Sequence, residues 1–203
     1  MSDNTGREQR HHDRMQRKKE VVDSKIAAAQ EERGILLVNP GNGKGKSSAA
    51  FGVVARALGH GHTVAVVQFV KGRSDTGEEG FFRKFPEQVR WHVCGEGFTW
   101  ETQDNSRDTL AAQAAWKIAQ GYLGDPSINL VVFDEMTYAF KYGWLDLAEV
   151  LTAIAARPLM QTVIVTGRGA PEALIEAADT VTEMAMVKHA FKAGVKAMPG
   201  VEY

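Results

Sequence analysis

The stretch that decides the fold of this chain is Gly41-Asn42-Gly43-Lys44-Gly45-Lys46-Ser47-Ser48. It follows an apolar run at residues 35–38 and precedes a helix-like run at residues 49–58. A strand, a glycine-rich turn, Lys-Ser and a helix in this order describe a P-loop. Glycines let successive backbone N–H groups surround phosphate oxygens, and the N-terminus of the next helix adds partial positive charge. The stretch therefore predicts a nucleotide phosphate site, in preference to a glycine-rich turn that only caps a helix.

Two P-loop side chains have predicted tasks. Lys46 would bring a full positive charge to the terminal phosphates, and the Ser47 hydroxyl would ligate Mg²⁺. The complete pattern has a glycine five residues before Gly45, where this chain has Pro40. Because proline has a fixed φ and no N–H to donate, we expect the phosphate chain to be held in an unusual register or direction.

The composition fits one domain with a sizeable core. The chain has 203 residues, of which 44% are hydrophobic and 24% charged, and its net charge is -1. A near-neutral chain lacks the electrostatic footprint of a nucleic-acid-binding protein, so no nucleic-acid partner is expected. The single cysteine, Cys94, excludes an intramolecular disulfide and is interpreted as a small core residue. No apolar run approaches the roughly 18 residues of a membrane span, and the N-terminus lacks an apolar signal core, so we expect a cytoplasmic protein without a membrane partner.

From residue 34 onward, strand-like and helix-like runs alternate. The predicted strands are 35–38, 63–69, 89–93, 130–133, 162–166 and 181–186, and the predicted helices are 46–58, 106–122, 146–156 and 171–178. Continuously apolar strands are typical of a parallel sheet covered on both faces. We therefore expect an α/β fold of the P-loop NTPase (RecA-like) type, with a mostly parallel sheet, helices on both faces and ligands at the carboxyl ends of the strands.

Residues 1–33 form a charged N-terminal arm, and residues 34–203 form the predicted P-loop domain. Between Arg7 and Lys19 there are six basic residues against two acidic ones. Two interpretations stay open for the arm: a solvated or disordered tail, and a helix that orders against a partner subunit or over a ligand.

Acidic residues follow the apolar run at 130–133. Asp134 and Glu135 come at the end of this strand, where Asp134 would help to hold Mg²⁺ directly or through water. Glu135 would bind the metal, contact the substrate or complete a polar strand end. Arg168 follows the strand at 162–166 and would either approach phosphates or remain an ordinary loop arginine.

The loop at 94–103 contains two large aromatic side chains, Phe98 and Trp100, among polar residues and glycines. One interpretation is that they pack onto the core, as tryptophan usually does. The other is that they form a wall for a flat, apolar ligand.

Several segments together resemble one known family, the ATP:corrinoid adenosyltransferases of the P-loop type. The resemblance is collinear over about residues 34–203, and it is carried by the P-loop octet, Val66–Gly72, Gly97–Thr102, Asp134–Tyr138, Thr166–Gly169 and Val187–Ala197. The P-loop is shared with many families, whereas Gly-Phe-Thr-Trp-Glu-Thr at 97–102 and the tail are far more specific. The family usually has Thr-Thr after the lysine, where this chain has Ser47-Ser48, and either hydroxyl can meet Mg²⁺.

The resemblance implies a transferase reaction. A reduced Co(I) corrinoid would attack the 5′ carbon of ATP and release triphosphate, yielding adenosylcobalamin or an adenosylated precursor in cobalamin biosynthesis. The cobalt is then the nucleophile, so the protein orients the substrates and stabilises the leaving group, with Lys46 as the catalytic residue. The P-loop residues 41–48 and Arg168 would bind ATP, bound in reversed orientation, and Ser47, Asp134 and Glu135 would hold Mg²⁺.

The resemblance also implies partners. Phe98 and Trp100 would pack beneath the corrin ring and displace the lower axial ligand from Co(II), which eases its reduction. The family is dimeric, its N-terminal segment can cover the corrinoid in the partner subunit, and a flavoprotein is the expected reductant.

Two other functions share some of these residues. A small P-loop kinase would use Lys46, Ser47 and Asp134 but needs an acceptor site and a base, and it would release ADP. A regulatory RecA-type module would act through oligomers or nucleic acid. The basic stretch at 7–19 is the only sequence feature that favours this function.

Overall fold

The computed structural model describes residues 2–70, 76–94 and 105–201, with the backbone alone for residues 2–5. The chain divides into two compact units, residues 1–32 and 33–203. The first unit is α1 (Ser2–Ala28), whose side chains from Arg7 onward are exposed. Its described contacts are short-range, such as the pair of Lys19 and Asp23 at 3.8 Å. The segment is helical from Ser2 to Ala28, and its ordering against a partner subunit or over a ligand stays a prediction.

The second unit is built on a six-stranded sheet in which every pairing is parallel, in the order β3-β2-β4-β5-β1-β6. Its strands are β1 (Leu36–Asn39), β2 (Val64–Gln68), β3 (Val89–Val93), β4 (Leu130–Asp134), β5 (Thr162–Thr166) and β6 (Thr180–Val181). The P-loop strand β1 is therefore separated by β5 from β4, the strand that ends in the acidic residues. A site that uses both the P-loop after β1 and the acidic residues of β4 must therefore extend across the carboxyl end of β5.

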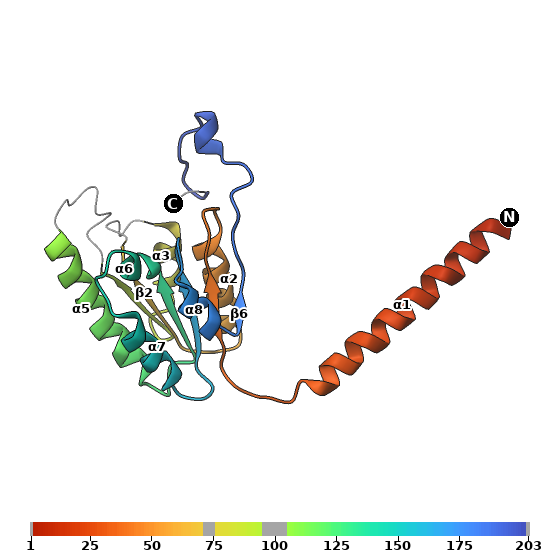
Figure 1. The fold of residues 1–203 in the computed structure, drawn as a ribbon, viewed down its shortest axis with the longest axis horizontal. Coiled ribbons are helices and arrows are strands. Elements are labelled where there is room, and N and C mark those ends of the chain that lie inside the picture. Colours follow the sequence, from red (N-terminus) through yellow and green to blue (C-terminus); the bar gives the residue numbers. More distant parts are fainter. Residues whose placement is uncertain (1, 71–75, 95–104, 202–203) are drawn as a thin grey trace. The chain divides into compact units, whose positions relative to one another are not determined.

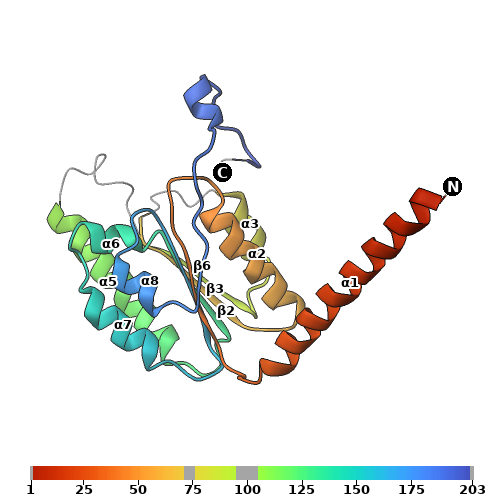
Figure 2. The same cartoon turned by 45° about the vertical axis from the view of Figure 1, so that its right-hand side comes forward.

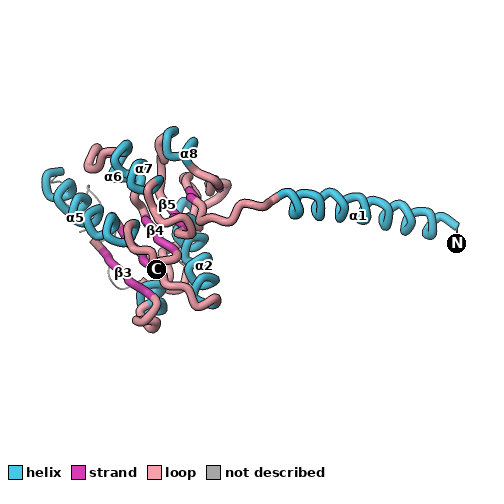
Figure 3. Tube along the Cα trace, turned by 90° about the horizontal axis from the view of Figure 1, so that it is seen from below, coloured by secondary structure: helices cyan, strands magenta, loops and turns pink. Residues whose placement is uncertain are grey.

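Helices cover both faces of the sheet, as Figures 1 and 2 show. Along each central strand, alternate residues enter different cores: Val131 and Phe133 of β4 join one, Leu130 and Val132 the other. The view in Figure 3 shows the strands between the two helical layers. The predicted α/β class with helices on both faces is thereby confirmed.

One layer contains α2 (Lys46–Gly59) and α3 (Gly77–Phe82). The other contains α5 (Asn105–Leu123), α6 (Thr137–Lys141), α7 (Leu147–Ala155) and α8 (Glu172–Ala177). The four predicted helices are present within one or two residues of their expected ends. Helix α2 is followed by Gly61, which lies in the left-handed region at φ 75°. The short helices α3 and α6 and the 3₁₀ turn η1 (Ala190–Ala193) were not predicted.

The predicted strand at 181–186 is wrong in its extent, because β6 ends at Val181. Beyond that residue the chain follows the P-loop instead of continuing in the sheet: the N–H of Thr182 donates to the Val38 carbonyl, and that of Met184 donates to the Pro40 carbonyl. The residues after it, 187–201, form a tail that projects past the carboxyl end of the sheet (Figure 1). No helix in the described part of the chain is both long and apolar enough to cross a membrane.

Candidate active site

The P-loop closes between β1 and α2 with two glycines in conformations that other residues rarely adopt. Gly41 has φ 111° and Gly45, which precedes the first turn of α2, has φ 106°. Glycine enters this region without the steric penalty that a Cβ brings. The loop therefore places the N-terminus of α2 at the carboxyl edge of the sheet, where an anion gains from the unsatisfied N–H groups.

The P-loop glycines also allow a second backbone to come close. A Cβ on Gly43 would lie 2.6 Å from the carbonyl oxygens of Met184 and Ala185, and one on Gly41 would lie 2.5 Å from that of Met184. The Gly43 N–H donates to the Met184 carbonyl at 2.6 Å, and the Met184 N–H donates to the Pro40 carbonyl at 2.8 Å. Pro40 thus takes part in this contact through its carbonyl, although it has no N–H to offer.

A cleft of about 230 Å³ opens over the loop. It is lined by residues 43–48 together with Glu78, Glu135, Tyr138, Gly167, Arg168, His189 and Val201. Three basic side chains line it, Lys44, Lys46 and Arg168, against two acidic ones, Glu78 and Glu135. This excess of positive charge suits an anionic ligand.

Lys46 is held inside the cleft by the loop itself, because its Nζ donates to the Gly43 carbonyl at 2.5 Å. Burial lowers the pKa of Lys46, and the charge of Arg168 lowers it further, while Glu135 and Asp134 act in the opposite direction. A polyanion between Lys46 and Arg168 would relieve their repulsion and favour the charged ammonium. A phosphate chain bound between the two cations is therefore expected to stabilise their positions.

The two acidic residues at the end of β4 have different settings. Asp134 is fully buried, and its carboxylate oxygens accept hydrogen bonds from two neighbouring strands: Oδ1 from the Thr166 hydroxyl at 2.7 Å, and Oδ2 from the Gln68 Nε2 at 2.9 Å. Glu135 lines the cleft and has φ 59°, the one positive φ among the described non-glycine residues. Its N–H donates to the same Thr166 hydroxyl at 3.0 Å. A non-glycine residue held in this region stores of order 1–3 kcal/mol of strain, and such strain clusters at functional sites.

Thr166 is thus the link between the P-loop side of the sheet and the acidic strand. It ends β5, between β1 and β4, and its hydroxyl both donates to Asp134 and accepts from Glu135. The sequence did not single it out as a site residue, since a threonine at a strand end is common.

The loop after β5 is positioned by Thr137. A Cβ on Gly167 (φ 142°) would lie 2.0 Å from the Thr137 hydroxyl, which donates to the Arg168 carbonyl at 2.8 Å. Only glycine fits this approach, and the hydrogen bond fixes the backbone from which the Arg168 side chain reaches the cleft.

The structure brings together most of the residues that the sequence predicted. Residues 43–48, Glu135 and Arg168 line the cleft, whereas Gly41 and Asn42 do not, and Asp134 lies buried beneath it. Phe98 and Trp100 lie outside the described residues. Sequence reasoning missed five lining residues, Glu78, Tyr138, Gly167, His189 and Val201. Three of them, Tyr138, Gly167 and His189, belong to segments that carry the family resemblance.

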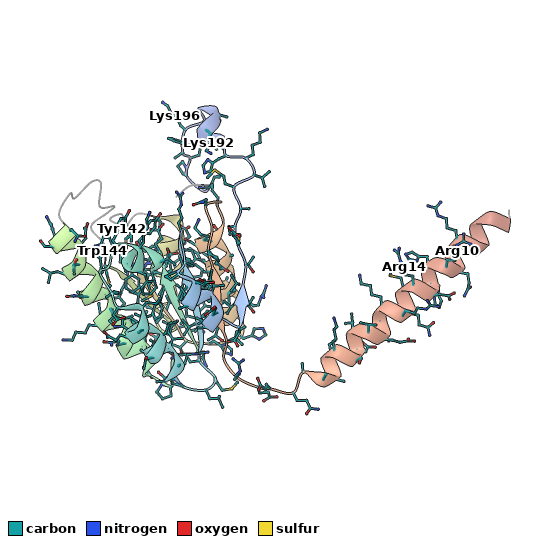
Figure 4. All side chains as sticks on the ribbon, in the orientation of Figure 1. Arg10, Arg14, Tyr142, Trp144, Lys192 and Lys196 are labelled. Carbon is teal, nitrogen blue, oxygen red and sulfur yellow. The ribbon has the colours of Figure 1, made fainter. Side chains whose placement is uncertain are left out.

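The described residues that flank the aromatic loop are fixed at the same edge of the sheet. The Cys94 N–H donates to the Gln68 carbonyl at 3.0 Å, and the Asn105 side chain accepts from the Trp144 Nε1 at 2.9 Å. Trp144 in turn lies 5.2 Å from Tyr142 between ring centroids, a pair visible in Figure 4. A second cavity of about 390 Å³ adjoins the cleft through Ser48, Glu78 and Val201 and is otherwise rich in phenylalanine.

The donor chemistry of the cleft fits Mg²⁺. The Ser47 hydroxyl and the Glu135 side chain both line it, and oxygen atoms are the ligands that Mg²⁺ prefers. Within the described residues there is no cluster of three or more His, Cys, Asp or Glu side chains suited to a metal. A hydroxyl and one carboxylate, completed by phosphate oxygens and water, match the way Mg²⁺ is usually held beside nucleotides.

Two family models match the chain. One, described as ATP:corrinoid adenosyltransferase BtuR/CobO/CobP, matches residues 32–203, and the other, described as Cob(I)alamin adenosyltransferase N terminal, matches residues 1–26. Their boundary coincides closely with that between the two units of the structure.

Curated relatives are similar along the full chain. A corrinoid adenosyltransferase of Pseudomonas aeruginosa is 64% identical over 203 residues, covering 100% of both chains. The corrinoid adenosyltransferase CobA of Salmonella typhimurium is 50% identical over 196 residues, covering 97% of this chain and 99% of its own. A corrinoid adenosyltransferase of Escherichia coli is 49% identical with the same coverage.

Proposed function

This chain belongs to the ATP:corrinoid adenosyltransferase family, and from that membership we propose which of its residues carry the reaction. The enzyme transfers the 5′-deoxyadenosyl group of ATP to the Co(I) of a corrinoid. The cobalt lone pair forms a bond to C5′, the bond from C5′ to the phosphate oxygen breaks, and its electron pair leaves with triphosphate. The observation that carries the assignment of the site is the cleft over the P-loop, which gathers Lys46, Arg168 and the N-terminus of α2.

The protein's main task in this reaction is to stabilise the leaving group. Triphosphate takes up negative charge as the C5′–O bond breaks, and prepositioned cations and N–H groups lower the barrier to that step. Lys46 would exchange its hydrogen bond to the Gly43 carbonyl for one to a phosphate oxygen, and Arg168 would bind the same chain. The loop amides of residues 44–48 would hold the remaining oxygens.

A protein nucleophile or general base is not required, because the substrate's cobalt performs the attack. Cys94 fits this view, since burial raises the pKa of its thiol and so disfavours the reactive thiolate. The chemistry then depends on orientation, which a bound triphosphate and a fixed corrin ring supply.

We assign Mg²⁺ to Ser47 and Glu135, where it would neutralise part of the triphosphate charge. Asp134 is fully buried with both oxygens bonded to Thr166 and Gln68, which favours an indirect role for its carboxylate. In this role it holds Thr166, whose hydroxyl receives the Glu135 N–H and so keeps Glu135 in its strained conformation at the cleft.

The corrinoid would bind beside the loop that carries Phe98 and Trp100. Support comes from the flanking residues Cys94 and Asn105, which are fixed at the carboxyl edge of the sheet close to Gln68 and Trp144. We also propose that residues 1–33 contribute to corrinoid binding, that the enzyme works as a cytoplasmic homodimer, and that a flavoprotein supplies the electron. Light scattering of the purified chain at several concentrations tests the dimer.

The function itself is tested by an anaerobic assay with ATP, Mg²⁺ and chemically reduced cob(I)alamin. The spectral change of Co–C bond formation is followed, and the phosphate product is identified. Adenosylcobalamin with intact triphosphate is expected from the wild type, with loss of activity in Lys46→Ala. The matched control is Lys117→Ala, which removes the same side chain from the exposed face of α5. Release of ADP without alkylation of the cobalt would refute the transferase assignment and favour a kinase.

A further inference from the structure

Two residues of the cleft wall, His189 and Val201, come from the tail. His189 lines the cleft together with Lys46 and Arg168, although it lies outside the P-loop and the strand ends. Its place follows from the contact described above, in which the Met184 backbone is bonded on both sides to the P-loop. His189 is the fifth residue after Met184, so the imidazole is tethered close to the phosphate-binding loop.

The structure also fixes which ring nitrogen of His189 carries the proton. The backbone N–H of Phe191 donates to His189 Nδ1 at 3.1 Å. An N–H group can only donate, so Nδ1 must be the acceptor and the ring proton resides on Nε2. His189 therefore serves two partners at once: Nδ1 caps the 3₁₀ turn at 190–193, and Nε2 offers a donor.

We propose that His189 binds the triphosphate group, with its Nε2–H donating to a non-bridging oxygen of bound ATP and of the released triphosphate. This inference rests on the proposed function and extends it to a residue of the tail. The cleft already holds cations close enough for Arg168 to lower the pKa of Lys46. The Nε2–H group of His189 adds a directed hydrogen bond to the phosphate chain from the side of the cleft that the tail forms.

The other basic residues of the tail do not share this position. Lys188, Lys192 and Lys196 are exposed and are not part of the cleft lining. Figure 4 shows Lys192 and Lys196 on the projecting end of the tail. A contribution from the general charge of the tail would act through these lysines, whereas a specific contact would act through His189, so the two can be separated by mutation.

Two substitutions divide the functions of the ring. His189→Asn keeps a side-chain oxygen at the distance of Nδ1, so that it can still accept from the Phe191 N–H and cap the turn, but it removes the donor at Nε2. His189→Gln does the reverse, because its amide nitrogen reaches about as far as Nε2. Lys192→Ala is the matched control on the same tail.

The experiment measures the dissociation constant of inorganic triphosphate by titration calorimetry with the full chain, in the presence of Mg²⁺. A hydrogen bond to a charged phosphate predicts binding about 10-fold to 100-fold weaker in His189→Asn, recovered to within about threefold of wild type in His189→Gln. Lys192→Ala is expected to bind as wild type does. Thermal unfolding of each free variant shows that the fold is retained.

Each outcome is decisive for one of the two claims. Equal affinity in wild type and His189→Asn, or an equal loss in Lys192→Ala, would overturn the role of His189. Failure of His189→Gln to recover binding, with its fold intact, would also overturn it. Failure of wild type to bind triphosphate at all would instead refute the proposed placement of the phosphate chain in this cleft, which is a separate result.

Discussion

Thr166→Val removes the hydroxyl that joins β4 to β5 while leaving the side-chain volume almost unchanged. Thr166 is fully buried, so water cannot replace its hydroxyl at Asp134. The change deletes a hydrogen bond of 2.7 Å to a carboxylate, which is worth about 1.5–3 kcal/mol. It also leaves the Glu135 N–H without its acceptor, at a penalty of about 1–3 kcal/mol. We expect a loss of roughly 3–5 kcal/mol in the free energy of unfolding, a large share of the 5–15 kcal/mol typical of a domain.

The control is Thr166→Ser, which keeps the hydroxyl and loses only a methyl group, for about 1 kcal/mol. Urea unfolding followed by tryptophan fluorescence measures both, because all four tryptophans belong to residues 33–203 and report on the unit that contains the site. The reasoning predicts that the valine variant is at least 2 kcal/mol less stable than the serine variant. It also predicts that only the valine variant loses adenosylation, since Glu135 is no longer held in its strained conformation. Two variants of equal stability would refute the claim that Thr166 holds the acidic strand end.

Four further predictions concern other parts of the chain. Asp179→Asn should lower the free energy of unfolding by about 1 kcal/mol at pH 7. The Arg33 side chain and the Leu36 N–H lower the pKa of the Asp179 carboxyl from 3.8 to about 2. Such a shift corresponds to roughly 2.5 kcal/mol for a buried group, and the partial exposure of Asp179 reduces it. Because the folded pKa is depressed, this stabilisation is present above pH 3.8 and lost toward pH 2, so urea unfolding at pH 7 and pH 3 should show the gap between variant and wild type narrowing. Gly43→Ala should abolish ATP binding and destabilise the fold by about 1–3 kcal/mol, because its Cβ would collide with the backbone of the tail. Gly52→Ala, whose Cβ would meet no atom within 4 Å, should instead stabilise α2 by about 0.5–1 kcal/mol. Equal melting temperatures for the two variants would contradict the close approach of the tail to Gly43. Trp100→Ala should slow adenosylation with ATP affinity nearly unchanged, and loss of ATP binding in calorimetry would mark the residue as structural. Deletion of residues 2–32 should weaken corrinoid binding in a spectral titration, and unchanged affinity would mark α1 as a solvated arm.

The central elements could be predicted from the sequence because their signals are local. The strands at 89–93 and 162–166 have the predicted bounds: the first alternates apolar and polar residues, and the second has an apolar centre flanked by threonines. The P-loop and Arg168 were found for the same reason: a short pattern specifies a backbone conformation, and parallel strands bring their carboxyl ends to one edge.

The parts that were missed depend on contacts between distant segments. The run at 181–186 looks like a strand, but β1 ends at Asn39 and leaves it no partner, so the chain follows the P-loop instead. The metal-binding role predicted for Asp134 stays a prediction, but the hydrogen bonds from Gln68 and Thr166 to its two oxygens could not be foreseen, because they come from two other strands. His189 lies about 140 residues from the P-loop, a separation over which periodicity and spacing carry no information.

The contact between the tail and the P-loop determines when the site can be completed during protein synthesis. A ribosome adds about 5–20 residues per second, so roughly 7–30 s pass between the synthesis of Gly43 and that of Met184. During that interval the sheet can begin to assemble, but the phosphate-binding loop lacks the backbone that closes it. The nucleotide site is therefore among the last features of this protein to be completed, and a nascent chain still short of Met184 passes through synthesis with its P-loop unfinished.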